Sequence, residues 1–203
     1  MRISNCSRGF TLIELLVVIT IIGILAGLAV PAVGKALEAA KKAETGAMVN
    51  QLRTALVQYE TEYGVWPSAL AGTGSPPADA DATSEDLYDT LIARDAGLNA
   101  EHADNTRRIV FMEFNTKILR SGSPGQGNRT APANPSSATF FVDPWSQLYY
   151  FRADSNYDNS ISLPSPFTGS LSSSLIIWSP GPQKNYSSDG GGTEINKFVT
   201  SWK

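Results

Sequence analysis

Three oxygen-bearing side chains stand at alternate positions in one short stretch of the sequence. Asp154, Asn156 and Asp158 follow the spacing D-x-N-x-D, which is typical of the start of an EF-hand-type calcium loop. Asn159 can adopt the left-handed turn that glycine usually provides there. Such loops close with a bidentate acid at the twelfth position, where this chain has Ser165. We therefore expect weak calcium binding or, alternatively, a plain turn braced by Asx side chains.

A carboxylate interrupts the most apolar part of the chain. Glu14 is the one charged residue in the 21-residue run 10–30. A charged side chain in hydrocarbon costs several kcal/mol unless something neutralises it. If this run lies in a membrane or among other apolar helices, Glu14 is expected to meet a positively charged partner.

The chain offers little material for other chemistry. It has one cysteine, Cys6, and one histidine, His102, which leaves little material for a zinc site or a Cys/His nucleophile pair. Lys and Arg number 16 against 19 Asp and Glu, which argues against nucleic acid as a partner. We expect a protein that is not an enzyme and requires no cofactor.

The run 10–30 is long enough to cross a bilayer as a helix. Arg2 and Arg8 precede it, so its start is predicted on the cytoplasmic side and the rest of the chain is exported. The run is longer than a usual signal-peptide core, and no A-x-A-like site ends it. A signal anchor on a non-assembling periplasmic protein stays open as an alternative.

Helical periodicity continues beyond this run. Pro31 is expected to kink or soften the helix, and Gly64 followed by Pro67 is expected to end it. The pattern favours one helix of about 54 residues, with two helices divided at Pro31 as the alternative. The predicted apolar stripe is formed by Val33, Leu37, Ala40, Ala47, Leu52, Leu56, Tyr59 and Tyr63.

The remainder predicts a small α+β domain. Strand-like runs occur at 139–142, 147–153 and 174–179, with a further one near 195–202, and their short links favour an antiparallel sheet. Segment 71–87 is small and polar and predicts a surface loop, whereas 107–114 predicts an extended, half-buried segment. Ser84 is expected to cap a short helix, and Trp145 and Trp178 are expected in the core. The long helix would pack on one face of this sheet.

The stretch Gly9-Phe10-Thr11-Leu12-Ile13-Glu14-Leu15 resembles the processing motif of the type IV pilin-like family, which includes pilins and the pseudopilins of type II secretion. The resemblance implies that a prepilin peptidase cuts between Gly9 and Phe10 and methylates the new amine. It further implies that Glu14 pairs with the Phe10 amine of a neighbouring subunit, which would offset the cost of burying either charge and set the register of the filament.

Other pieces resemble the major pseudopilins in particular. The helix end ALVQYETEYGVWP is similar to theirs, as is Asp143-Pro144-Trp145 before a strand. Ser179 and Gly181 match the start of their C-terminal calcium loop, although Gln183 replaces the usual Asp. The resemblance leaves Asp189 and Glu194 as acidic groups for structural calcium there. Asp143 is also expected to brace its own turn.

We therefore predict a leader at 1–9, a membrane and filament-core helix at 10–30, its amphipathic continuation at 31–66 and a globular α+β domain at 67–203. The predicted function is a pseudopilus subunit for type II secretion, with a type IV pilus subunit as the alternative. The expected location is the bacterial inner membrane, with the domain in the periplasm and then in a periplasm-spanning filament. The implied partners are other copies of the chain, prepilin peptidase, an inner-membrane assembly platform, minor pseudopilins and, before assembly, membrane lipid.

Overall fold

The structure is a computed structural model that describes residues 10–72, 80–121, 139–183 and 195–202. The chain divides into two compact units, an N-terminal unit of Met1–Lys41 and a C-terminal unit of Lys42–Lys203. Each is described by itself.

One long helix, α1, runs from Leu12 to Tyr63 and contributes to both units. Helical structure continues through Pro31, so the alternative of two helices divided there is wrong. The end comes at Gly64, as expected. Its φ of 73° is in the left-handed region that glycine tolerates, and its N–H donates to the carbonyl of Glu60 at 2.7 Å.

The N-terminal unit leaves the apolar side chains of α1 exposed. The large apolar residues between Leu12 and Val30 are 46–87% exposed. By length and composition α1 is the one helix among the described residues that could cross a membrane. A run of this kind needs lipid or protein around it.

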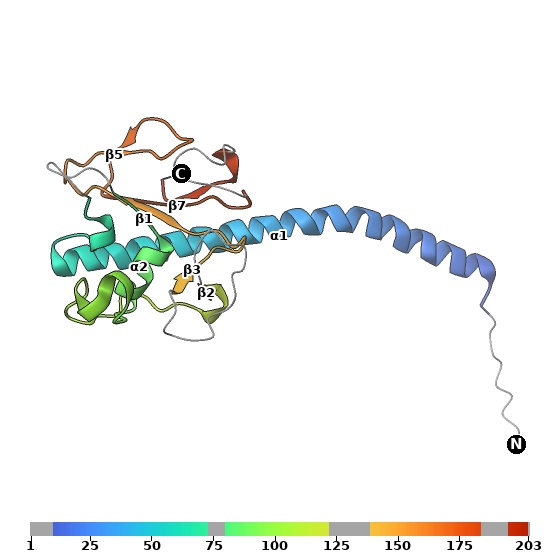
Figure 1. Ribbon diagram of the computed structural model, residues 1–203. Coiled ribbons are helices and arrows are strands. Elements are labelled where there is room, and N and C mark those ends of the chain that lie inside the picture. Colours follow the sequence, from blue (N-terminus) through green and yellow to red (C-terminus); the bar gives the residue numbers. More distant parts are fainter. Residues whose placement is uncertain (1–9, 73–79, 122–138, 184–194, 203) are drawn as a thin grey trace, which may run out of the picture. The chain divides into compact units, whose positions relative to one another are not determined.

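The C-terminal unit is built on a four-stranded antiparallel sheet with the order β1-β4-β7-β8. Strands β1 and β7 of this sheet are labelled in Figure 1. Two short antiparallel ladders, β2-β3 and β5-β6, accompany it, together with a two-turn helix, α2. This confirms the predicted α+β class. The strands are β1 Ala80–Thr83, β2 Leu119–Ser121, β3 Thr139–Phe141, β4 Tyr150–Ala153, β5 Ile161–Ser162, β6 Ser170–Leu171, β7 Leu175–Ser179 and β8 Val199–Thr200, and the helices are α2 Ser84–Leu91 and 3₁₀ turns at Ser68–Leu70, Gly97–His102, Thr116–Ile118 and Ile195–Lys197.

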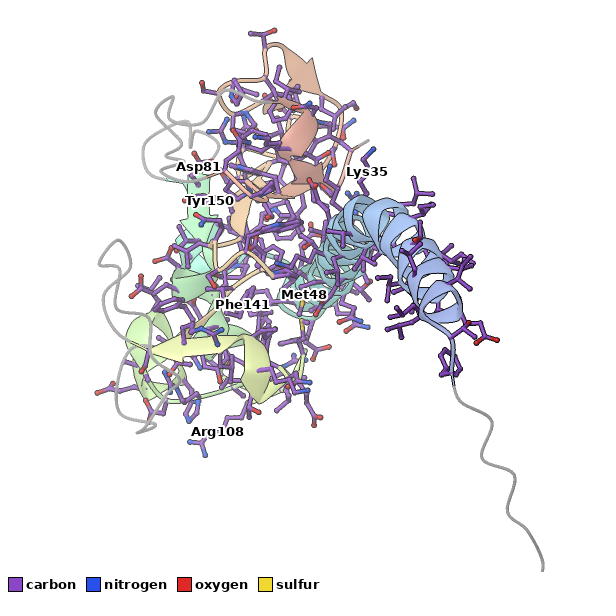
Figure 2. The ribbon with its side chains drawn as sticks, turned by 90° about the vertical axis from the view of Figure 1, so that its right-hand side faces the viewer. Lys35, Met48, Asp81, Arg108, Phe141 and Tyr150 are labelled. Atoms are coloured by element: carbon purple, nitrogen blue, oxygen red, sulfur yellow. The ribbon has the colours of Figure 1, made fainter. Side chains whose placement is uncertain are left out.

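The main core lies where the last turns of α1 meet the sheet and α2 (Figures 1 and 2). Leu52, Leu56 and Tyr59 are buried there as the periodicity predicts, whereas Ala40 and Ala47 of the predicted stripe are exposed. Phe141 lies inside this core, and Arg108 points out into solvent. The buried face of α1 therefore begins only in the C-terminal unit.

The central strand β7 is buried on both sides. Leu175 and Ile177 pack into the main core with α1, whereas Ile176 and Trp178 pack into a second cluster on the opposite face. This alternation is the period of two that a strand imposes on its side chains. The second cluster also contains Ile161, Phe198 and, partly buried, Tyr150, Leu163, Phe167, Leu171 and Trp202.

Two predictions about the secondary structure of this unit are wrong. Ala80–Thr83, expected in a surface loop, forms strand β1 and pairs with β4. Ser84 does not cap α2. The carboxylate of Asp86 instead accepts hydrogen bonds from the backbone N–H and hydroxyl of Thr83, and the Ser84 hydroxyl donates to the carbonyl of Phe141 at 2.6 Å.

Candidate functional site: the start of helix α1

Glu14 caps the helix that carries it. Its Oε2 atom accepts one hydrogen bond from the backbone N–H of Thr11 at 2.8 Å and another from the Thr11 hydroxyl at 2.6 Å. The N–H of Glu14 donates back to the Thr11 hydroxyl oxygen at 3.3 Å. Together these bonds form a capping box, which satisfies amide groups that the first turn of a helix would otherwise leave without partners.

The surroundings of Glu14 are apolar. Ile13, Val17 and Val18 line the same open groove as Glu14 and Phe10, and the Phe10 ring is exposed. The carboxylate thus lies on an apolar helical surface with its charge partly compensated by its own helix start. Both of the Thr11 bonds go to Oε2, so a cationic donor from elsewhere can still approach Oε1.

The role of Thr11 was not predicted from the sequence. The signal was present as Thr-x-x-Glu directly before an apolar run, which is the spacing of a capping box. Gly9, the predicted residue before the cut, lies outside the described residues. Cleavage at Phe10 and a kink at Pro31 stay predictions.

Asp143 joins the two segments that resemble pseudopilins. Its Oδ1 accepts the N–H groups of Trp145 at 2.9 Å and Gln147 at 2.7 Å, which fixes the Asp-Pro-Trp turn. Its Oδ2 accepts the Ser179 hydroxyl at 2.5 Å, and the N–H of Gly181 donates to that hydroxyl oxygen at 3.0 Å. Asp143 is buried, so these charge-assisted bonds hold the turn and the Ser-x-Gly loop together. Trp178 is in the core as predicted, but Trp145 is only half-buried.

The candidate calcium loop is stabilised by its own amides. Asp154 is buried, and its two carboxylate oxygens accept the N–H groups of Asp158 at 3.1 Å and Asn159 at 2.7 Å. Asn156 donates to the carboxylate of Asp158 at 2.8 Å. This is the geometry of an Asx-braced turn.

The described residues contain no cluster of three His, Cys, Asp or Glu side chains suited to a metal ion. Asp189 and Glu194 lie outside the described residues, and calcium at either loop stays an untested prediction.

Comparisons with known proteins agree with the N-terminal features. Residues 4–30 match the family model described as the prokaryotic N-terminal methylation motif. The type IV major pilin protein PilE1 of Neisseria gonorrhoeae is 38% identical over 78 residues, which cover 37% of this chain and 47% of that protein. The fimbrial protein EcpC of Eikenella corrodens is 38% identical over 72 residues, covering 36% and 47%. The chain thus spans less than half the length of these two relatives.

A third relative matches over a longer stretch. The fimbrial protein of Moraxella nonliquefaciens is 32% identical over 117 residues, which cover 55% of this chain and 69% of that protein. No solved structure matches the chain significantly. The methylation motif, the long apolar helix on an antiparallel α+β unit and these pilin relatives together show that the chain belongs to the type IV pilin-like family.

Proposed function

We propose that the chain is a structural subunit of a type IV pilus filament and assembles through the apolar part of α1. The observation that carries this proposal is the exposed apolar helix with Glu14 near its start. Before assembly the helix would span the bacterial inner membrane once, and the C-terminal unit would lie in the periplasm. The role is architectural and needs no catalytic group.

Processing and assembly are coupled in this proposal. Prepilin peptidase would cut before Phe10 and leave a positive amine one helical turn from Glu14. In the filament, the amine of a neighbouring copy would approach Glu14 among apolar side chains. Such a pair offsets much of the cost that either charge alone would carry there. An inner-membrane assembly platform would deliver successive copies.

A substitution at Glu14 tests this proposal. We expect Glu14→Ala to lower the yield of sheared filaments at least about tenfold, because the neighbour's amine would lose its partner in apolar surroundings. Glu38→Ala, which also removes an exposed carboxylate from α1, is the control and should leave the yield within about twofold. Filaments are counted by electron microscopy against the total amount of the protein. Equal yields from both variants would contradict the role of Glu14.

A subunit of a type II secretion pseudopilus is the second candidate. It is favoured by the contact between Asp143 and Ser179, which joins the Asp-Pro-Trp turn to the Ser-x-Gly loop, the two segments that resemble major pseudopilins. The names of the relatives favour the surface pilus. A strain that lacks the gene separates the two: loss of surface fibres with normal secretion supports the pilus, whereas enzymes retained in the envelope with normal fibres support the pseudopilus.

A further inference from the structure

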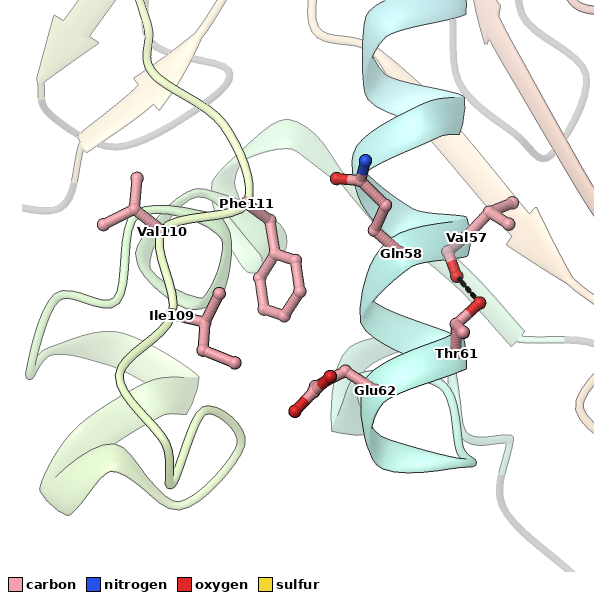
Figure 3. Close-up of a pocket in the computed structure, with 7 residues that line it drawn as sticks. All are labelled: Val57, Gln58, Thr61, Glu62, Ile109, Val110 and Phe111. Carbon is pink, nitrogen blue, oxygen red and sulfur yellow. Dashed lines mark hydrogen bonds between the residues drawn. The ribbon is translucent and has the colours of Figure 1, made fainter.

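The C-terminal unit carries an open groove beside the last turns of α1 (Figure 3). Its volume is about 370 Å³. The ring of Phe111 and the side chain of Ile109 point toward the helix across the groove. Both come from a segment that the sequence predicted to be a half-buried extended run. The complete lining is Val57, Gln58, Thr61 and Glu62 from α1 and Ile109, Val110 and Phe111 from this segment.

One buried side chain holds the segment 109–111, the wall of the groove opposite α1, in place. Asn105 is fully buried, and its Nδ2 donates to the carbonyls of Ile109 at 2.7 Å and Thr90 at 2.8 Å. Its Oδ1 accepts the N–H of Ile109 at 2.9 Å and the hydroxyl of Tyr63 at 2.7 Å. The wall is therefore tied to both α1 and α2 before any partner arrives, which lowers the entropic cost of binding.

The groove presents no net charge. Glu62 is its one charged lining residue, and its carboxylate forms an ion pair with Arg107. Exposed pairs of this kind add little stability, but they cancel the charge that an apolar occupant would meet. Val57 and Val110 leave apolar surface on the two sides. An acidic or basic peptide would find no complementary charge here. An apolar helix needs no such charge and would contact the apolar lining instead.

The chain itself supplies such a helix in abundance. Leu12, Leu25, Leu28 and Val30 are among the most exposed large apolar side chains of the described residues. Lipid can cover them in the membrane, but in a filament outside the membrane only other copies can. Apolar surface that leaves lipid must be covered again. A second copy of the chain can cover it with its own apolar helix or with its apolar groove.

We propose that this groove is an assembly contact that receives apolar side chains of α1 from a second copy of the chain. The inference rests on the proposed filament function and adds to it a binding surface in the C-terminal unit that does not involve Glu14. The groove would accept side chains spaced three or four residues apart on one face of the incoming helix.

Two valines of nearly equal exposure provide a matched test. Val110, 55% exposed, lines the groove, whereas Val65, 54% exposed, is not among its lining residues. We expect Val110→Glu to lower the filament yield about tenfold, because assembly would bury a charge without a partner, and Val65→Glu to change it less than twofold. Thermal melts of the full chain in detergent check that both variants fold.

Cross-linking tests the occupant directly. Cys6, the single thiol of the sequence, lies in the segment that the proposed cut before Phe10 removes, so Val110→Cys is combined with one cysteine in the apolar part of α1 without a competing thiol. Oxidation of filaments is expected to give covalent multimers when Val110→Cys is paired with at least one of the α1 cysteines. Pairing Val65→Cys with the same α1 cysteines is expected to give none. The positions tried are Ile22→Cys, Leu25→Cys and Leu28→Cys.

The outcomes separate this inference from the proposed function. If the wild-type chain forms no filaments, the proposed function fails and this inference fails with it. If the wild type assembles but Val110→Glu matches Val65→Glu, or if Val110→Cys cross-links to no α1 position, only the groove contact is wrong. Cross-links between two copies through Val110→Cys alone would point to groove-to-groove packing and would also overturn it.

Discussion

Replacing Asn105 by alanine should destabilise the C-terminal unit strongly. The side chain is fully buried and makes four hydrogen bonds, of 2.7–2.9 Å, to Thr90, Ile109 and Tyr63. At about 1 kcal/mol net for each bond, the loss is roughly 4 kcal/mol. Domains of this size have only about 5–15 kcal/mol of stability, so most of the chains would stay folded at room temperature with a much smaller reserve.

The measurement is thermal unfolding of the full chain in detergent, followed by near-ultraviolet circular dichroism. A loss of this size corresponds to a fall in Tm of about 8–16 °C. Asn115→Ala is the control, because Asn115 is exposed and its side chain accepts one hydrogen bond, from the N–H of Lys117. Its Tm should fall by less than about 4 °C. If the two variants had the same Tm, Asn105 could not be the residue that fastens the groove wall.

Two further predictions concern stability. Gly181→Ala should destabilise the fold by about 2 kcal/mol or more, because the φ of Gly181 is 66° and a Cβ would collide with the carbonyl oxygen of Lys197. Gly46→Ala, in open space on α1, should stabilise the fold by about 0.5–1 kcal/mol. The midpoints of denaturant titrations should therefore shift in opposite directions for the two variants, and shifts in the same direction would contradict the clash at Gly181. Burial, with a smaller contribution from Asp143, raises the pKa of Tyr149 above its ordinary value of about 10. The stability that comes from keeping Tyr149 neutral is complete below about pH 10 and is lost as the pH rises further. Tyr149→Phe should therefore reduce the fall of Tm with rising alkaline pH in melts recorded at several pH values. An unchanged dependence of Tm on pH would refute this.

The sequence was sufficient for features that depend on local pattern. The continuous apolar run, the three-to-four-residue period of Leu52, Leu56 and Tyr59, and the stop at Gly64 all follow from helix geometry and are found in the structure. The three main strand-like runs also form β3, β4 and β7. Each combines apolar, β-branched or aromatic residues with neighbouring turn residues.

The errors occur where a distant partner determines the conformation. Ala80–Thr83 has few strand-forming side chains and becomes strand β1 because β4 offers it a ladder. The segment 107–114 was predicted only to be extended and half-buried, and its position also depends on a distant contact, because the N–H of Phe111 donates to the carbonyl of Leu91 at the end of α2. No local pattern could have placed Asn105 between Thr90, Ile109 and Tyr63, because the contacts come from three separate segments.

At the candidate site, the type and position of Glu14 could be read from the sequence, but its contact with Thr11 was overlooked. The pairing of Asp143 with Ser179 spans 36 residues and joins two motifs that were recognised separately. A motif identifies each segment, whereas only the fold shows that the two share a hydrogen bond.

The four-stranded sheet has a consequence for the way in which copies can associate. Its outer strands are short, four residues in β1 and two in β8, and β1 carries Asp81 in a two-pronged ion pair with Arg152 of β4. Short, charged edges are poor templates for the backbone of another chain. Growth by strand exchange or by amyloid-like stacking is therefore disfavoured. A polymer of this protein would be expected to lengthen and come apart through side-chain contacts alone, without breaking any β-ladder.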